Sequence, residues 1–158
     1  MKAAIDESSA AYSQKFIRAH LPRMFRDAAK LECSVTLIGL KLIAETIGEV
    51  TLDAIESAFV QTSELINNLV RMQDVVCRWD DDKFILAFFD TDEAQAKIIL
   101  SRIDALLDCT VYDGGHAEVA VVNVSSKSLI KEFNPANETS EGQLDSFIAN
   151  LLQASTEN

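Results

Sequence analysis

The sequence has few of the residues that build metal centres and disulfide frameworks. It contains three cysteines, none of them in a Cys-x-x-Cys pair, and two histidines, His20 and His116, which belong to no ligand cluster. We therefore expect no metal site and no cofactor. The cysteines lie in or beside apolar runs, which predicts buried thiols in a reducing cytosol.

Long apolar runs and positive charge are also scarce. No run approaches the roughly 20 residues that cross a bilayer, and the first residues lack the apolar core of a signal peptide. Lys and Arg number 14 against 25 Asp and Glu, which gives a formal net charge of −11. This charge disfavours nonspecific binding to nucleic acid or to anionic membranes, although it permits a local basic pocket. We expect a cytoplasmic chain without nucleic-acid binding or membrane insertion.

What the sequence does contain is enough apolar content, 48% of 158 residues, for the core of one domain. The apolar spacing predicts helices over 8–30, 51–71, 91–107 and 139–153, and strands over 33–40, 75–79, 84–89, 109–113 and 117–124. Pro22 predicts a kink or a break in the first helix. Residues 41–48 fit either a short helix or an irregular connection, and residues 125–138 are polar and indicate a loop.

Capping residues and apolar stripes support these helices. Thr51 and Thr91 are predicted N-caps, and Ser140 with Gln143 is predicted to form a capping box. Asp113, Gly114 and Gly115 predict a hairpin turn. The expected buried stripes are Leu52, Ile55, Phe59, Ile66 and Leu69 in one helix, and Ala96, Ile99, Leu100, Ile103 and Leu106 in another.

The element order is therefore helix, β-α-β-β-α-β-β, helix. This order predicts an α+β sandwich of ferredoxin-like plan, in which helices flank a mostly antiparallel sheet. We expect a single domain over 1–158, with a helical leader at 1–30, a core at 33–124 and a C-terminal helix at 139–153.

Two charged groups stand close together in the middle of the chain. Arg71 and Asp74 are expected at the end of a helix, and Asp80–Asp82 at the tip of a hairpin. The hairpin segment, Arg78-Trp79-Asp80-Asp81-Asp82-Lys83-Phe84, aligns without gaps on Arg-Tyr-Gly-Gly-Asp-Glu-Phe. With the element order and weaker echoes at 6–15 and 48–53, the chain resembles the bacterial GGDEF domain, the family of diguanylate cyclases. The resemblance implies a five-stranded, nucleotidyl-cyclase-like fold.

The departures from the family pattern concern its catalytic residues. Asp80 and Asp81 replace two glycines that let the backbone approach a nucleotide. Lys83 replaces an acid, and Gly39 and Lys41 stand where the family has metal-binding aspartates, so hard oxygen ligands are lost. Leu152 replaces a phosphate-contacting lysine, and the family's guanine-binding Asn has no counterpart. Of the Gly-Gly-Asp-Glu-Phe signature, Asp82 and Phe84 are retained, and Asp53 keeps one guanine-contact position. The resemblance therefore implies a domain that no longer makes cyclic di-GMP.

A second family site is retained in sequence. Arg71 and Asp74 match the Arg-x-x-Asp inhibitory motif at the family's distance from the hairpin, and Arg102 falls where a further arginine completes that site. The resemblance implies that these residues bind cyclic di-GMP, with Arg78 a further candidate for its phosphates. Guanidinium groups grip phosphate or the guanine edge with paired hydrogen bonds, and a carboxylate accepts from guanine N–H donors.

Three functions follow, and the resemblance favours the first of them, with the second as the main alternative. The first is a cyclic di-GMP receptor that relays the signal to a protein partner. The second is a pseudo-enzyme scaffold that dimerises or docks a partner without nucleotide. The third is residual GTP or ATP binding or hydrolysis through Asp53 and Asp82. The Arg71–Asp74 pair also fits a plain surface ion pair, worth about 0.3–0.5 kcal/mol.

Overall fold

The computed structural model describes residues 11–114 and 120–156. Within these residues, helices and strands follow one another in the predicted order. They are α1 (Gln14–Leu31), β1 (Val35–Ile47), α2 (Leu52–Leu69), β2 (Val75–Asp80), β3 (Lys83–Phe89), α3 (Glu93–Asp108), β4 (Val111–Asp113), β5 (Val121–Phe133) and α4 (Gln143–Thr156). No helix in the described part of the chain combines the length and the apolar content needed to cross a bilayer.

One five-stranded sheet, with the strand order β2-β3-β1-β5-β4, forms the centre of the molecule. Every neighbouring pair is antiparallel. Helices α2 and α3 pack on one face and contribute to one apolar core, while α1 and α4 pack on the other face and contribute to a second. The predicted α+β class with helices flanking an antiparallel sheet is confirmed.

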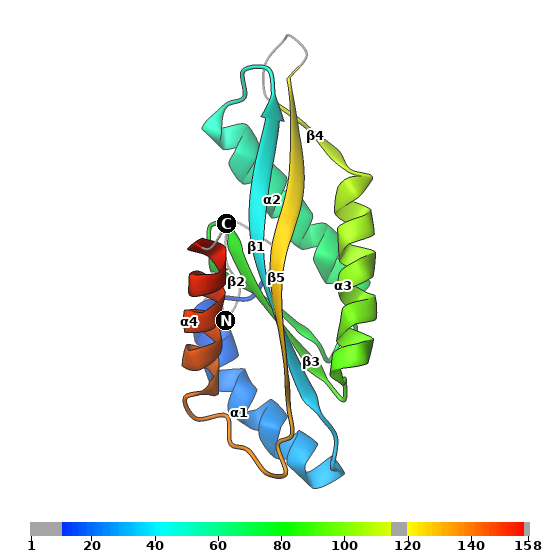
Figure 1. Ribbon diagram of the computed structural model, residues 1–158, viewed down its shortest axis with the longest axis vertical. Helices are drawn as coiled ribbons and strands as arrows, with labels where there is room; N and C mark the ends of the chain where they lie inside the picture. The colour runs from blue at the N-terminus through cyan, green and yellow to red at the C-terminus, as the bar shows by residue number, and fades with distance from the viewer. Residues whose placement is uncertain (1–10, 115–119, 157–158) are drawn as a thin grey trace.

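Strands β1 and β5 are much longer than predicted. They pair from Val35 with Phe133 to Ile47 with Val121, and they run along most of the molecule (Figure 1). The segment 41–48, expected as a short helix or an irregular connection, is strand as far as Ile47. Residues 125–133, expected as loop, are also strand. Both segments lie partly outside the cores, where backbone pairing holds a strand together without apolar side chains.

Helix α1 begins later than predicted and is not broken. Ser13 caps it by accepting from the N–H of Phe16, and the helix continues through Pro22 to Leu31. Pro22 is exposed, so its ring lies on the solvent side of the helix. The predicted start at residues 8–10 lies outside the described residues. The helix ends at Glu32, which adopts a left-handed conformation with φ 54°.

The other helix starts agree with prediction in one case of three. Thr51 caps α2 as expected. Helix α3 is capped by Asp92, which forms a capping box with Gln95, and not by Thr91. Helix α4 starts at Gln143, directly after Gly142 with φ 73°, so the capping box predicted from Ser140 would begin the helix too early.

Two of the predicted buried residues are exposed. Leu52, in the first turn of α2, is 84% exposed, and Leu69, in its last turn, is 38% exposed. The buried face of α2 consists instead of Ala58, Phe59, Thr62, Ser63 and Ile66. Cys109 is exposed at the end of α3, contrary to the expectation of a buried thiol in a strand, whereas Cys77 is buried.

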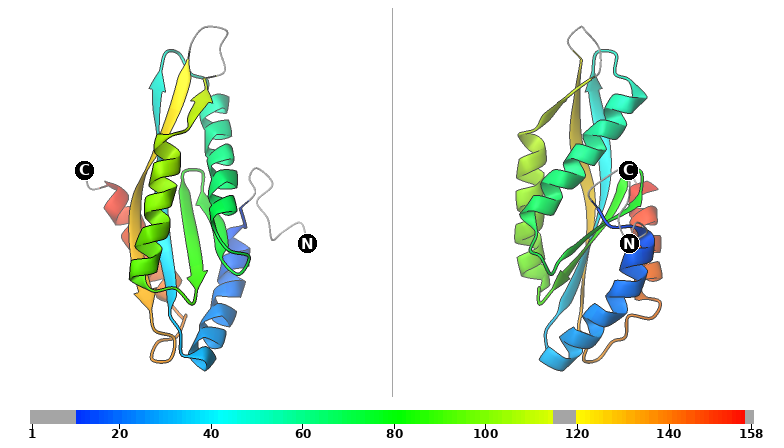
Figure 2. Two further views of the ribbon diagram at one scale, coloured as in Figure 1. Left: turned by 90° about the vertical axis from the view of Figure 1, so that its right-hand side faces the viewer. Right: turned by 180° about the vertical axis from the view of Figure 1, so that it is seen from behind.

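The two edges of the sheet differ (Figure 2). At the β2 edge, Tyr12 forms a parallel bridge with Cys77: its N–H donates to the carbonyl of Val76 at 2.8 Å, and its carbonyl accepts from Arg78 at 2.9 Å. At the other edge, β4 pairs only with Val121–Asn123 of β5. The predicted β4–β5 pairing is confirmed, while Gly115 of the predicted turn lies outside the described residues.

Candidate functional site

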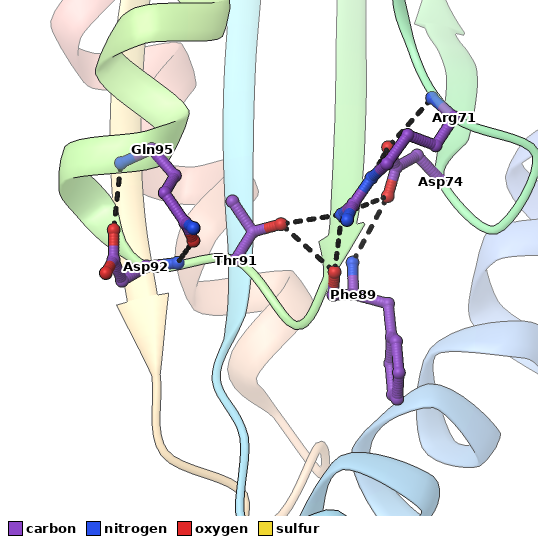
Figure 3. Close-up of polar contacts among 6 residues, drawn as sticks. All are labelled: Arg71, Asp74, Phe89, Thr91, Asp92 and Gln95. Carbon is purple, nitrogen blue, oxygen red and sulfur yellow. Dashed lines mark hydrogen bonds and ion pairs between the residues drawn. The ribbon is translucent and has the colours of Figure 1, made fainter.

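Arg71 and Asp74 lie in the short connection between α2 and β2, not at the end of a helix as predicted. Helix α2 ends at Leu69, and Val70 already has extended backbone angles. The N–H of Asp74 donates to the carbonyl of Arg71 at 3.0 Å and closes a tight turn. This turn places the carboxylate of Asp74 beneath the side chain of Arg71 at the start of β2 (Figure 3).

The carboxylate of Asp74 is buried and fully engaged, since its side chain is 1% exposed. It accepts from the Arg71 side chain at Nε (3.1 Å) and Nη2 (3.2 Å), from the Arg71 backbone N–H (3.0 Å) and from the Phe89 N–H (3.4 Å). A carboxylate accepts about four hydrogen bonds. The pair is therefore part of the fold, and it is not the plain surface ion pair that was one alternative.

Arg71 is fixed from a second side as well. Its Nη2 donates to the carbonyl of Phe89 at 2.6 Å and to the hydroxyl of Thr91 at 2.8 Å. Thr91, which was predicted to cap α3, serves instead as an acceptor for Arg71 (Figure 3). The Arg71 side chain nevertheless remains 46% exposed. The result is a guanidinium held in one orientation while one part of it faces solvent.

Arg71 and Arg102 line the same cavity, as the resemblance implied. The cavity measures about 240 Å³, and its lining comprises Arg71, Asp90, Thr91, Gln95, Ile98, Ile99 and Arg102. Two guanidinium groups and a side-chain amide give it hydrogen-bond donors, Asp90 gives it one carboxylate, and two isoleucines give it an apolar wall. This combination suits a ligand with both an anionic group and a flat apolar ring.

Arg78, the further candidate for the phosphates, does not line this cavity. It is buried, and its Nη2 donates to both carboxylate oxygens of Glu56 at 2.8 and 3.0 Å and to the carbonyl of Asp81 at 2.9 Å. These bonds join β2 to α2 and to the hairpin tip. The structure thus gives Arg78 a role in the fold.

At the hairpin tip, one lysine neutralises part of the negative charge of the acidic residues. The ammonium of Lys83 lies 2.9 Å from Asp82 and 4.0 Å from Asp80, and it is largely buried. The N–H of Asp81 donates to the Asp80 side chain at 2.8 Å. Phe84 is fully buried in the core, as predicted. The tip is a closed turn of acidic residues around one lysine.

The positions implied for metal-binding aspartates, Gly39 and Lys41, carry no side-chain oxygen. A Cβ at Gly39 would lie 2.9 Å from both Cδ atoms of Leu151 and 3.1 Å from the Phe147 ring, because α4 packs directly on this residue. Lys41 pairs with Lys83 across β1 and β3, and the ammonium of Lys83 lies 2.9 Å from Asp82. A divalent cation needs oxygen ligands, and at these two positions the chain supplies a glycine and a lysine.

Asp53 lies apart from both groups. It is exposed in the first turn of α2 and lines a cavity of about 550 Å³ with Thr51, Ala54, Ser57, Gln61 and Asp113. Leu152, where the family has a phosphate-contacting lysine, is 42% exposed on α4. Among the described residues, no guanidinium or ammonium group lines the cavity around Asp53.

A second cavity, missed by the sequence reasoning, lies against the same turn from the side of α1. It measures about 300 Å³ and its lining includes Tyr12, Phe16, His20, Gln73 and Asp74. The rings of Tyr12 and Phe16 stack at 3.9 Å, and those of Phe16 and His20 at 5.1 Å. Burial, followed by the charge of Arg23, lowers the pKa of His20. The four-residue spacing of the three rings was the available signal.

Comparison with known proteins gives one family. The family model of the diguanylate cyclase GGDEF domain matches residues 3–122. No curated protein sequence matches the chain.

Solved GGDEF structures share the fold at low sequence identity. The FimX GGDEF domain from Pseudomonas aeruginosa has a TM-score of 0.79 at 12% identity, covering 98% of this chain and 95% of that one. The DgcB GGDEF domain from Caulobacter crescentus, in complex with c-di-GMP, has a TM-score of 0.78 at 12% identity over 98% and 88%. The diguanylate cyclase SiaD from Pseudomonas aeruginosa, in complex with its activator SiaC, has a TM-score of 0.74 at 15% identity over 99% and 60%.

At these identities the likeness between structures concerns the fold, and the family assignment rests on the sequence match. Because the family model covers most of the described sheet and three of its helices, this chain belongs to the GGDEF domain family.

Proposed function

We propose that this chain is a GGDEF domain without cyclase activity that binds cyclic di-GMP in the cavity between Arg71 and Arg102. The observation that carries the proposal is the held guanidinium of Arg71, which opens into the cavity that Arg102 reaches from α3. An arginine that is already ordered loses little side-chain entropy when it binds an anion.

The lack of cyclase activity rests on the chemistry of the catalytic positions. Diguanylate cyclases need metal ions to bridge and neutralise the triphosphate. Gly39 provides no side chain, and the space that an aspartate would fill is taken by Leu151 and Phe147. Lys41 and Lys83 stand on neighbouring strands beside Asp82 and repel a cation. Asp80 and Asp81 add negative charge where the nucleotide would approach.

The ligand roles differ from those that the motif implies. Arg71 and Arg102 supply donors for a phosphate or for the guanine edge. Asp74 has its acceptor positions engaged by Arg71 and Phe89, so it orients Arg71 and does not itself read guanine. Asp74 is therefore a positioning residue in this proposal, and Arg78 is not a ligand residue.

A calorimetric titration of cyclic di-GMP tests the proposal. We expect wild-type protein to bind, and Arg71→Ala and Arg102→Ala each to weaken binding about ten- to hundredfold, since each removes a charged hydrogen-bonding group. Arg26→Ala is the matched control, because Arg26 is exposed on α1 and lines neither cavity. Absence of heat with wild-type protein, or equal binding by both site variants, would contradict the proposal.

A turnover assay with GTP and Mg²⁺ or Mn²⁺ tests the catalytic part separately. We expect no cyclic di-GMP and no nucleotide hydrolysis above the level of a buffer control. Sustained production by purified protein would overturn the claim of inactivity and would favour residual chemistry through Asp53 and Asp82.

The second candidate is a nucleotide-independent scaffold that dimerises or docks a partner protein. The observation that favours this second candidate is the SiaD structure, in which a GGDEF-type structural neighbour is bound to an activator protein. A scaffold would keep its partner when Arg71 and Arg102 are both replaced by alanine. In a receptor, the same double replacement would abolish the effect of cyclic di-GMP on partner binding.

A further inference from the structure

Strand β5 has an open edge over most of its length. It pairs with β1 over all of Val121–Phe133, but with β4 only at Val121–Asn123. Among the described residues, no strand pairs with residues 124–133 on the side away from β1. In the left view of Figure 2, this part of β5 runs along the margin of the sheet between α3 and α4. A strand edge of this kind is a template for a further strand.

The register shows which backbone groups face outward. The N–H of Gly114 donates to the carbonyl of Ala120 at 2.7 Å on the β4 side. Backbone groups alternate between the two sides of an antiparallel strand, so the even-numbered residues of β5 face away from β1. Ser126, Ser128 and Ile130 therefore present their N–H and C=O groups to the open edge.

The side chains on the α4 face give this edge a chemical pattern. Leu129 packs against the core of α1 and α4, so the odd-numbered residues point to that face. Lys127 and Lys131, both exposed, flank Leu129 two residues away on each side. A groove of about 110 Å³ lies beside the edge, and its lining includes Leu129, Lys131, Ser146 and Phe147. The pattern is one small recess of mixed apolar and polar lining that includes Lys131, with Lys127 two residues before Leu129 on the same face.

A second copy of this chain fits the edge poorly. When two β5 edges pair antiparallel, the outward-facing even residues of one copy lie opposite even residues of the other copy. The odd residues then lie opposite odd residues. The symmetric register centred on Leu129 then sets Lys127 opposite Lys131 twice. The registers one residue to either side set a lysine against Leu129. Like charges directly opposite destabilise a strand pair.

We propose that the β5 edge binds an extended segment of a partner protein, which adds as a sixth strand. The segment carries a small aliphatic residue with an acidic residue two positions away on each side. The aliphatic side chain enters the groove beside Leu129 and Phe147. The two carboxylates lie opposite Lys127 and Lys131, and the partner backbone pairs with Ser126, Ser128 and Ile130. This inference does not depend on cyclic di-GMP binding.

The probe is the peptide Ser-Thr-Glu-Thr-Val-Thr-Glu-Thr-Ser, blocked at both ends, and a matched peptide has lysine in place of both glutamates. Binding is measured by fluorescence anisotropy, and its place by amide shifts in NMR spectra without nucleotide. We expect the glutamate peptide to bind with shifts centred on Ser126, Ser128 and Ile130, and the lysine peptide to bind at least about tenfold more weakly. No binding by the glutamate peptide, or shifts elsewhere, overturns the proposal.

Two variants test the contacts separately. Ser128→Pro removes an outward N–H while the bonds to β1, made by odd residues, remain, and we expect about tenfold weaker binding. Lys131→Glu should weaken binding of the glutamate peptide and strengthen binding of the lysine peptide. Lys97→Glu, an equal charge change at an exposed site on α3, should leave both unchanged. If Ser128→Pro does not fold, the charge exchange at Lys131 decides, and equal binding of both peptides by that variant refutes the proposal.

Discussion

The guanidinium of Arg71 and the carboxylate of Asp74 meet at two points, with Nε to Oδ2 at 3.1 Å and Nη2 to Oδ1 at 3.2 Å. The two partners differ in exposure: the Arg71 side chain is 46% exposed and that of Asp74 is 1% exposed. Within the motif, Arg71 therefore faces solvent, and Asp74 holds the Arg71 side chain in place. The proposed ligand contacts fall on the arginine, and the contribution to folding falls mainly on the aspartate.

Replacing Asp74 with alanine should destabilise the protein by about 2–3 kcal/mol. The change leaves the N–H of Phe89 and of Arg71 without their acceptor and releases the guanidinium. Urea unfolding followed by circular dichroism measures the difference. Asp145→Ala is the control, since Asp145 pairs with Arg18 on the surface and its loss should cost less than about 0.5 kcal/mol. Equal effects of the two changes would show that Asp74 is not structural.

Gly39→Ala should destabilise the protein by about 1–3 kcal/mol, because the added methyl group meets Leu151 and Phe147. Leu151→Ala alone should also be destabilising, since it opens a cavity under α4. The double variant should lose less stability than the sum of the two, because the smaller side chain at 151 makes room for the methyl group. Strict additivity in thermal unfolding would contradict the packing described here. The control pair is Gly39→Ala with Leu152→Ala, where residue 152 is partly exposed.

Glu56→Gln should lower stability by about 1–2 kcal/mol and leave cyclic di-GMP affinity unchanged. Arg78 is buried, and the two oxygens of Glu56 are acceptors for its guanidinium. An amide leaves that charge with a weaker partner. Chemical denaturation gives the stability, and calorimetry gives the affinity. A large loss of affinity in a folded Glu56→Gln protein would return Arg78 to the ligand site.

Stability should decrease as the pH falls through the range in which an ordinary histidine titrates. Burial, followed by the charge of Arg23, lowers the pKa of His20 in the folded protein. The unfolded chain takes up a proton at about pH 6.5, whereas the folded chain resists it, so acid favours unfolding. Between about pH 7.5 and about pH 5.5, the free energy of unfolding should fall less steeply in His20→Gln than in wild type. Parallel curves for the two proteins would show that His20 does not contribute.

Much of the fold could be predicted from the sequence, because most elements have an apolar pattern of the right period. The strands at 75–79 and 84–89 were found to within one residue, and the order of all elements was correct. The errors share a cause. Residues 41–47 and 125–133 pair with each other along a ribbon that is partly exposed, and pairing of backbone groups far apart in sequence leaves no periodic apolar signal.

The residues of the candidate site were proposed from the sequence, whereas the contacts that hold them were not. The spacing from the hairpin identified Arg71, Asp74 and Arg102, and the structure places the two arginines around one cavity. The sequence could not show that Phe89 and Thr91, from the end of β3 and the following loop, hold Arg71. Nor could it show that the acceptor positions of Asp74 are all occupied by hydrogen bonds. It also could not show that Glu56 engages Arg78. Each of these contacts joins residues that are distant along the chain.

The bridge between Tyr12 and Cys77 has a consequence for how copies of this domain can associate. An aggregate of stacked sheets grows only if each added molecule offers a fresh edge to the next. Here the middle of the β2 edge pairs with the chain's own Tyr12, so this part of the edge is closed to a strand of another molecule. The domain is therefore poorly suited to be the repeating unit of a fibre that grows from one edge of this sheet to the other.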